Sequence, residues 1–245
     1  MVIITLPAYN EERTLPPLLE AIRDSMGENQ IRYRVIVVND GSSDGTAPAV
    51  DRMAAQMPIE RVDHPINRGL GETIRTGLLH ALRGADASDI IVTMDSDNTH
   101  TPGLIAHMVR DIREGNDVVV ASRFRPGARI IGLPLHRRLL SRSASLMFRV
   151  LFPTPNIRDF TSGFRAYRAR VLKQAFDTYG RDFVAESGFS CMVDILLKLR
   201  RLDAIMTEVP LILRYDLKFS VSKMLVLRTM ADTLKLMVVR RIGAQ

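Results

Sequence analysis

Two carboxylates stand two positions apart in the stretch "DSDNTH" (95–100), which directly follows the apolar run "DIIVTM". Side chains along an extended strand alternate between its two faces, so Asp95 and Asp97 would point to the same side and repel each other. A divalent cation with a phosphate behind it would remove that repulsion. Oxygen ligands without cysteine or paired histidine favour Mg²⁺ or Mn²⁺ over zinc. The stretch therefore indicates a metal and phosphate site, and a solvated turn is the alternative.

Four other polar stretches also follow apolar runs. The runs at 2–6, 33–39, 59–64 and 117–122 are followed by "PAYNEE", "NDGSSDGT", "NRGLGE" and "SRFRPG". Ligands of open α/β sheets bind beyond the carboxyl ends of the strands, so five loops are expected to meet at one edge. Asp40 could there accept hydrogen bonds from a base or a ribose hydroxyl; the alternative for its stretch is a turn with a helix cap.

Two common nucleotide-binding patterns are absent from the sequence. G-x-G-x-x-G does not follow the first apolar run, and G-x-x-x-x-G-K-[ST] occurs nowhere in the chain. Hydride transfer and ATP hydrolysis therefore lose support.

Segments of helical period alternate with the apolar runs, at about 15–22, 46–57, 70–83 and 102–114. Strands that are apolar on both faces and alternate with helices predict a mostly parallel sheet with helices on both sides, a Rossmann-like α/β fold. The pattern changes after residue 123. The sequence there predicts an arginine-rich helix over 129–152, a loop, a helix near 187–201, a strand at 204–213 and an amphipathic segment at 221–241. The 245 residues, 46% of them hydrophobic, can form one domain over 1–245.

Composition narrows the range of partners. A formal charge of +7 points to a polyanion, which could be nucleic acid, an anionic membrane or a phosphorylated small molecule. No helix-turn-helix or zinc pattern is present and aromatic residues make up only 6%, so a nucleic-acid partner is disfavoured. The single cysteine, Cys191, excludes an intramolecular disulfide and fits a reducing cytosol. We expect neither a signal peptide nor a membrane-spanning helix.

Six motifs occur in a characteristic order: "PAYNE" (7–11), "NDGSSDGT" (39–46), "DSD" (95–97), "VVVASRF" (118–124), "DFTSGFRAY" (159–167) and "SK" (222–223). The set resembles family 2 glycosyltransferases, and most closely the dolichyl/polyprenyl-phosphate mannosyltransferase (dolichol-phosphate mannose synthase) group. The resemblance implies a GT-A fold with C-terminal amphipathic interface helices and a Mg²⁺ or Mn²⁺ cofactor. It also implies inverting transfer of a sugar, mannose from GDP-mannose, onto a polyprenyl or dolichyl phosphate. Residues 1–123 would form the nucleotide-sugar half and 124–245 the acceptor half.

The resemblance also implies roles for individual residues. The residues implied to bind the donor are Pro7, Tyr9, Asn10, Glu11, Val38, Asp40, Asp95, Ser96, Asp97 and Lys223. Those implied to hold the metal are Asp95, Asp97 and Thr99, the last in place of the family's glutamine. Those implied to bind the acceptor phosphate are Arg123, Arg137, Ser141 and Arg214. Those implied to act in catalysis are Asp97, Arg123 and Asp194, the last in place of the family's glutamate. The spacing leaves open whether Lys218 or Lys223 contacts the pyrophosphate.

The nature of the acceptor bears on the chemistry and on the location of the protein. A phosphate monoester is ionised at neutral pH and needs no general base, so positioning and charge stabilisation would suffice. Arg137 and Ser141 are four residues apart and would share a helix face, although Arg137 and Arg138 could also form a solvated face. The segments 129–152 and 221–241 could lie on a membrane surface or pack on the sheet. We expect a cytoplasmic protein attached peripherally to the cytoplasmic face of the membrane, which a separate membrane protein could assist.

Other functions stay open from the sequence alone. The nearest is a polyprenyl-phosphate glucosyltransferase, or another family 2 transferase that uses a UDP-sugar. The non-enzymatic alternatives are a nucleotide-binding regulator and a nucleic-acid-binding module.

Overall fold

A computed structural model describes residues 1–133, 135–186, 188 and 190–217, with the backbone alone for 135–140, 142 and 144. Lys218, Lys223 and the predicted amphipathic segment 221–241 lie outside the described residues.

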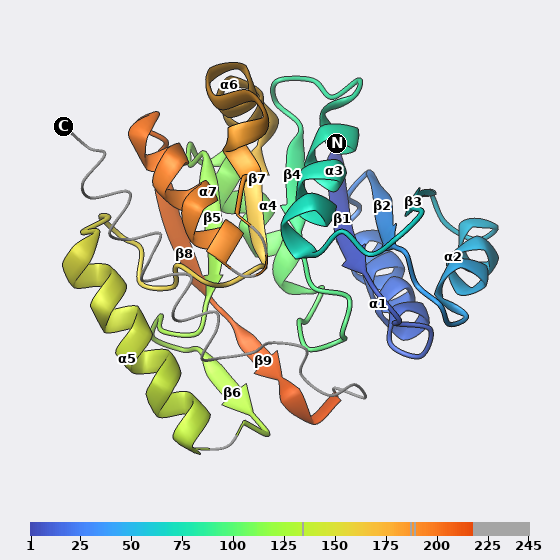
Figure 1. The fold of residues 1–245 in the computed structure, drawn as a ribbon, viewed down its shortest axis with the longest axis horizontal. Helices are drawn as coiled ribbons and strands as arrows, with labels where there is room; N and C mark the ends of the chain where they lie inside the picture. Colours follow the sequence, from blue (N-terminus) through green and yellow to red (C-terminus); the bar gives the residue numbers. More distant parts are fainter. Residues whose placement is uncertain (134, 187, 189, 218–245) are drawn as a thin grey trace.

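The centre of the molecule is a seven-stranded sheet with the order β3-β2-β1-β4-β7-β5-β8 (Figure 1). Strand β7 runs antiparallel to β4 and β5, and the other neighbouring pairs are parallel, so the prediction of a mostly parallel sheet is confirmed. The strands are β1 (Val2–Ala8), β2 (Tyr33–Asp40), β3 (Ile59–His64), β4 (Ile90–Thr93), β5 (Val118–Ser122), β7 (Arg165–Arg168) and β8 (Met206–Pro210).

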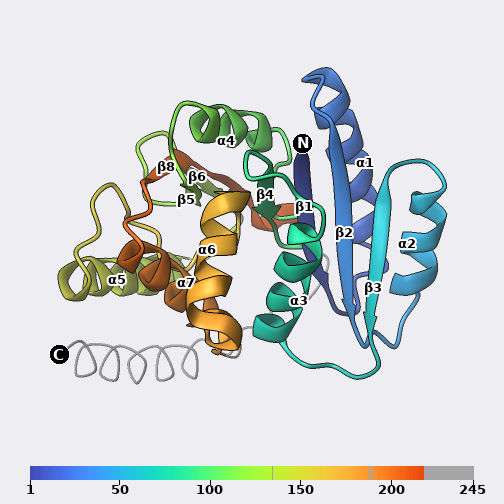
Figure 2. The ribbon, with the colours of Figure 1, turned by 90° about the horizontal axis from the view of Figure 1, so that it is seen from above.

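Helices cover both faces of this sheet (Figure 2). One buried cluster contains Ile3 of β1 with side chains of α3, α6 and α7, and a second contains Ile4 with side chains of α1, α2 and α4. Adjacent residues of one strand thus enter opposite cores, which explains why β1, β4 and β5 are almost entirely apolar. The helices are α1 (Leu15–Glu28), α2 (Thr46–Ala54), α3 (Leu70–Leu82), α4 (Leu104–Arg113), α5 (Leu135–Leu151), α6 (Ala169–Tyr179) and α7 (Ser190–Arg201), with 3-10 turns η1 (Gly180–Val184) and η2 (Tyr215–Leu217).

The second half differs from the sequence prediction in three places. The predicted helix over 129–152 begins instead with a short strand, β6 (Arg129–Ile131), and a turn at Gly132, where φ is +80°. The predicted strand 204–213 is divided, because β8 ends at Pro210 and β9 (Ile212–Arg214) leaves the sheet to pair with β6. Strand β7 and helix α6 were not predicted, since "RAYR" is not an apolar run.

The turn after β2 packs backbone to backbone against the loop after β3. Gly41 has a φ of +68°, and a Cβ added there would lie 2.5 Å from the carbonyl carbon of Ile66 and 2.6 Å from the amide nitrogen of Asn67. Gly84 has nearly the same φ, +69°, but a Cβ there would meet no atom within 4 Å. Alanine substitution at both glycines therefore separates the free-energy cost of a left-handed backbone from the cost of a steric clash.

We expect Gly84→Ala to lower the free energy of unfolding by about 1 kcal/mol, the cost of a left-handed conformation. Gly41→Ala should cost roughly 1–3 kcal/mol more, because the turn and the neighbouring loop must move apart. Urea unfolding of both variants measures the difference. Equal losses would show that the two loops do not pack as described.

Candidate active site

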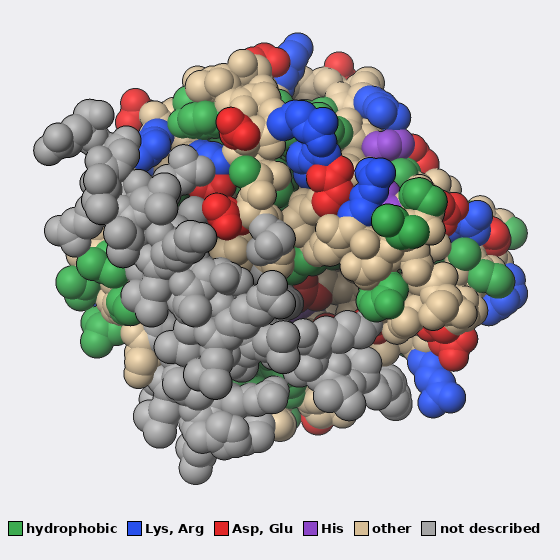
Figure 3. All heavy atoms as spheres, in the orientation of Figure 1, with side chains coloured by type: hydrophobic (Ala, Val, Ile, Leu, Met, Phe, Trp, Pro, Cys, Tyr) green, Lys and Arg blue, Asp and Glu red, His purple; other side chains and the backbone are tan. Residues whose placement is uncertain are grey.

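The loops that follow the parallel strands meet at one edge of the sheet, which is the lower edge in Figure 1, where β6, β9 and α5 also lie. Figure 3 shows a hollow near the centre of the face seen there, with acidic atoms inside it. This is the edge at which ligands of α/β sheets bind.

The acidic stretch lies in a bend and not on a strand. Strand β4 ends at Thr93, so the prediction that the strand reaches Asp95 is wrong. The amide of Asp95 donates to Nδ1 of His100 (3.4 Å), and Nε2 of the same ring lies 3.8 Å from Oδ2 of Asp95. His100 is buried and stacks on Phe164 with ring centroids 5.1 Å apart. The histidine therefore holds the bend in place, a role that the sequence did not predict.

Asp97 is oriented by Thr99. Its Oδ1 accepts hydrogen bonds from the hydroxyl (2.6 Å) and the amide (3.2 Å) of Thr99, which is buried. Thr99 thus acts in the structure as a donor to the acid, and its direct ligation of a metal stays a prediction. Ser96, between the two acids, is also buried, and its hydroxyl has no hydrogen-bond partner within the described residues.

The donor groups of this bend fit a hard cation that is shared with a ligand. Among the residues that the structure describes, no group of three or more His, Cys, Asp or Glu side chains is arranged to hold a metal ion. The protein would supply the carboxylates of Asp95, whose side chain is 33% exposed, and Asp97. Mg²⁺ commonly binds one or two carboxylates together with substrate phosphates and waters, so two acids are enough.

A loop after α5, residues 158–163, joins this bend to a buried ion pair. A Cβ at Gly163 would lie 2.8 Å from Oδ1 of Asp95, so the loop backbone packs directly on the acid. The hydroxyl of Thr93 donates to the carbonyl of Gly163 (2.8 Å) and fixes this approach. The hydroxyl of Ser162 is likewise buried and has no hydrogen-bond partner in the described part of the chain.

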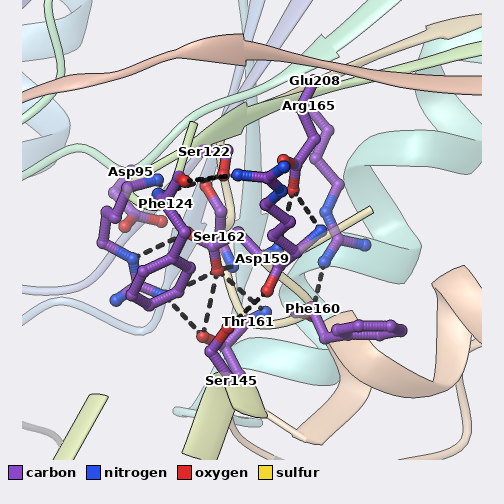
Figure 4. A network of polar contacts seen from close by, with 12 residues as sticks. Asp95, Ser122, Phe124, Ser145, Asp159, Phe160, Thr161, Ser162, Arg165 and Glu208 are labelled. Carbon is purple, nitrogen blue, oxygen red and sulfur yellow. Dashed lines mark hydrogen bonds and ion pairs between the residues drawn. The ribbon is translucent and has the colours of Figure 1, made fainter. Parts of the chain in front are cut away.

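At the other end of the loop, Asp159, which Figure 4 labels, forms a bidentate pair with Arg123. Nε donates to Oδ2 (2.8 Å) and Nη2 to Oδ1 (2.7 Å), and the amide of Arg123 also donates to Oδ2 (3.0 Å). Asp159 is completely buried. Burial alone would raise the pKa of its carboxyl, but the Arg123 guanidinium and its hydrogen bonds hold that pKa below the usual range. In the described structure Nη1 of Arg123 makes no hydrogen bond, so it is available to a ligand.

Arg123 lines a cavity of about 350 Å³ between β5, β6 and α5. Two predicted acceptor residues, Arg123 and Ser141, lie in its wall together with Arg129, which the sequence did not single out. The complete lining is Arg123, Phe124, Ala128, Arg129, Ile130, Ile131 and Ser141. Two cations and a hydroxyl beside apolar side chains suit a phosphate attached to a hydrocarbon.

Two other predicted acceptor residues are placed differently. Arg137 lies in α5, and its side chain is not among those described. Arg214, at the end of β9, forms a bidentate pair with Asp216 (2.8–3.2 Å) and does not line the cavity.

Most of the other predicted donor residues lie at the ends of β1 and β2 and in the loops that follow these strands. Pro7 and Val38 are register partners on β1 and β2. The loops after these strands are tied together, because Oδ1 of Asn10 accepts from the amide of Ser43 (2.9 Å) and the amide of Glu11 donates to Oγ1 of Thr46 (2.9 Å). Tyr9, beside them, is partly exposed. The structure therefore places the predicted donor residues of β1, β2 and the following loops close together, whereas Lys223 lies outside the described residues.

Asp40 has a structural role that the sequence did not indicate. Its Oδ1 contacts Nδ1 of His64 (2.7 Å) and accepts from the amide of Arg68 (2.9 Å), and its Oδ2 accepts from the amide of Gly69 (2.9 Å). His64 also contacts the hydroxyl of Thr76 (3.0 Å). Asp40 thus anchors the loop after β3, and contact with a nucleoside stays a prediction.

Asp194, predicted to act in catalysis, is completely buried in α7 and forms an ion pair with Lys198. The ammonium group of Lys198 also donates to the carbonyls of Asp182 and Phe183. These contacts belong to the protein core, and a catalytic role for Asp194 stays a prediction.

A family model described as Glycosyl transferase family 2 matches residues 3–176, more than half of the chain. The chain belongs to this family. It is 34% identical over 212 residues to the undecaprenyl-phosphate mannosyltransferase of Micrococcus luteus, which covers 86% of this chain and 82% of the relative. It is 27% identical over 198 residues to the dolichol-phosphate mannosyltransferase of Pyrococcus furiosus, covering 80% of this chain and 52% of that longer protein.

Solved structures bear out the fold. Glucosyl-3-phosphoglycerate synthase from Mycobacterium tuberculosis, crystallised with Mn²⁺, UDP and glucosyl-3-phosphoglycerate, superposes with a TM-score of 0.67 at 20% identity. The match covers 100% of this chain and 81% of that chain. This chain is therefore a glycosyltransferase with the predicted GT-A fold.

Removal of the charge of Asp159 should lower the free energy of unfolding, by an amount that depends on pH. Because its pKa is lowered in the folded state, the stability that it contributes is present above the unfolded pKa of about 3.9 and is lost as the pH falls through the folded value. We expect Asp159→Asn to lower the free energy of unfolding by about 3–5 kcal/mol at neutral pH, since it breaks a buried pair. Urea unfolding at several pH values should show that difference shrinking at acidic pH. A difference that does not change with pH would contradict the account.

Proposed function

We propose that this glycosyltransferase transfers mannose from GDP-mannose to a polyprenyl or dolichyl phosphate, with inversion at the anomeric carbon. One observation carries the proposal: Arg123, in the wall of a cavity with polar and apolar lining, is connected through one short loop to the acidic bend. The names of the relatives, which specify undecaprenyl and dolichol phosphates as acceptors, support it. Residues 1–123 would bind the donor and 124–245 the acceptor.

The proposed donor site is the edge formed by the loops after β1, β2 and β4. The nucleoside would lie against Pro7, Tyr9, Asn10, Glu11, Val38 and Asp40. Mg²⁺ or Mn²⁺ held by Asp95 and Asp97 would supply positive charge to the leaving diphosphate. The hydroxyl of Ser96, which has no hydrogen-bond partner in the described ranges, would be available to the same ligand. A basic residue of the C-terminal segment, Lys218 or Lys223, is proposed to add a further contact to the diphosphate.

The proposed acceptor site is the cavity beside Arg123. Arg123 and Arg129 would hold the acceptor phosphate with Ser141, and Arg137 and Arg214 would approach from α5 and β9. A phosphate oxygen, already ionised, attacks the anomeric carbon from the face opposite the diphosphate. The new C–O bond forms as the bond to the diphosphate oxygen breaks, and its electron pair leaves with the diphosphate. The protein therefore acts by alignment and charge stabilisation.

A lipid acceptor requires contact with a membrane. On α5 the side chains of Leu146 and Val150 are 60% and 72% exposed, and Arg149 stands beside them. On β6 and β9 the side chains of Ile131 and Ile212 are exposed beside the same cavity. No helix in the described ranges has both the length and the apolar character to cross a bilayer. We propose that this surface rests on the cytoplasmic face of a membrane, with or without a companion membrane protein.

Transfer of labelled sugar tests the proposal directly. Wild-type protein with Mg²⁺ or Mn²⁺ should move mannose from GDP-mannose to undecaprenyl or dolichyl phosphate, and Asp97→Asn should lower kcat by roughly 10²–10³, because it removes charge stabilisation of the leaving group. UDP-glucose is the competing donor. Absence of transfer to every polyprenyl phosphate would reject the lipid acceptor, and transfer only from UDP-glucose would reject the sugar.

A substitution that keeps the charge of Arg123 but changes its geometry should lower activity toward the acceptor. We expect Arg123→Lys to lower kcat/KM for the acceptor by about 100-fold, because a lysine cannot make the bidentate pair with Asp159 and also present a further nitrogen to the acceptor, while the affinity for the donor changes little. Arg125→Lys is the matched control, since Arg125 is close in sequence but does not line the cavity. Equal effects of the two substitutions would contradict the role of Arg123.

A further inference from the structure

Glu208 is a buried carboxylate that none of the proposed roles uses. It lies in the middle of β8, opposite Val120 of β5, and is 3% exposed. Burial raises the pKa of its carboxyl. An acid in the interior of a strand is unfavourable unless it makes strong hydrogen bonds, so its contacts should explain its presence.

Those contacts go to the loop that carries Asp159. Oε1 of Glu208 accepts the amides of Arg158 and Asp159, both at 2.7 Å, as Figure 4 shows for the labelled Glu208 and Asp159. From the other side, the hydroxyl of Ser145 on α5 donates to the carbonyl of Arg158 (2.7 Å). The start of the loop is thus held between β8 and α5.

The same loop also holds Arg123. The hydrogen bonds that lead from Glu208 through Asp159 to Arg123 are all 2.7–3.0 Å long. Glu208 fixes the backbone of Asp159, and the carboxylate of Asp159 fixes three donors of Arg123. Asp159 also accepts from the amide of Ser162 (3.1 Å), which shapes the turn toward Gly163. Asp95 also acts electrostatically on Arg123, but the bidentate contact of Arg123 is to Asp159. Its orientation in the cavity therefore depends on where Glu208 places the loop.

We propose that Glu208 is a positioning residue for the acceptor: through Asp159 it sets the orientation of the Arg123 guanidinium relative to Asp95. The phosphate contact of Arg123 rests on the proposed function, but the contacts that orient Arg123 do not. The far end of the loop is held separately, by Thr93 at Gly163 and by Arg165, whose Nη2 donates to the carbonyl of Phe160 (2.7 Å). Loss of Glu208 should therefore move Arg123 more than Asp95.

Substitution of Glu208 should change acceptor kinetics selectively. Glu208→Ala leaves two buried amides without an acceptor, and we expect kcat/KM for the lipid phosphate to fall by about 100-fold, as for a displacement near 1 Å. The Kd for the nucleoside diphosphate with Mn²⁺ should change by less than about threefold, because the contacts at Gly163 remain. Glu208→Gln keeps the oxygen that accepts both amides and should restore most of the acceptor kcat/KM.

Asp117 provides a matched control at the opposite end of the same strands. It is buried and accepts the amide of Ile205 (3.2 Å), as well as hydrogen bonding to Arg170 (2.9 Å). Asp117→Ala should lower stability in the same manner as Glu208→Ala without selective loss of acceptor kcat/KM. If both variants lose stability and activity in parallel, Glu208 has only a structural role and the inference is wrong.

A spectroscopic measurement separates this inference from the proposed function. The Nε–H of Arg123, held by Asp159, should give a resolved and slowly exchanging ¹H–¹⁵N signal, assigned by its absence in Arg123→Lys. Glu208→Ala should shift that signal or speed its exchange, and Glu208→Gln should restore it. This result without lipid-phosphate transfer would uphold the positioning role and reject the proposed acceptor. An unchanged signal in Glu208→Ala would overturn the inference whatever the substrate.

Discussion

The buried pair between Arg123 and Asp159 is the interaction on which the site depends. A buried carboxylate is costly unless it is paired and hydrogen-bonded, and Asp159 meets both conditions through side-chain and backbone contacts of one residue. The pair joins the end of β5 to the loop before β7. Its two residues, Arg123 and Asp159, are 36 positions apart in the chain. It keeps an arginine at a cavity wall in one orientation.

The loop 158–163 relates the two halves of the site. At one end it carries Asp159, and at the other the absence of a side chain at Gly163 allows it to pack against Asp95. Transfer between two phosphorylated substrates requires the electrophilic carbon and the attacking oxygen to be aligned, and much of the rate of such reactions comes from alignment. A short loop that is held by hydrogen bonds at both ends is a suitable element for that purpose, because small shifts at either end are resisted.

Sequence patterns predicted the first half of the fold because its strands are apolar on both faces. The runs that became β1, β4 and β5 are almost continuously apolar, as a parallel sheet requires, whereas the edge strand β3, "IERVDH", carries charged residues. Strand β7 escaped prediction because it is four residues long and includes Arg165, a fully buried arginine whose Nη1 and Nη2 donate to main-chain carbonyls. A local pattern cannot reveal a charge that is buried by distant partners.

Contacts between residues distant in the chain were likewise not predictable at the site. The acids of "DSD" were identifiable from their position after a strand, but the anchoring of Asp40 by His64 follows from the register of β2 and β3, in which the two residues are partners. A lone glutamate in an otherwise apolar strand, Glu208 in "TEVP", was a usable signal that was not taken up.

A crystal structure with Mn²⁺ and a nucleoside diphosphate is the most direct test of the central claim, that one loop holds the acidic bend and Arg123 in a fixed relation. We predict an anomalous Mn²⁺ peak at the carboxylates of Asp95 and Asp97, the diphosphate on the side of the Arg123 cavity, and an unbroken Arg123–Asp159 pair. A metal bound elsewhere, or a pair that opens when the diphosphate binds, would contradict the account.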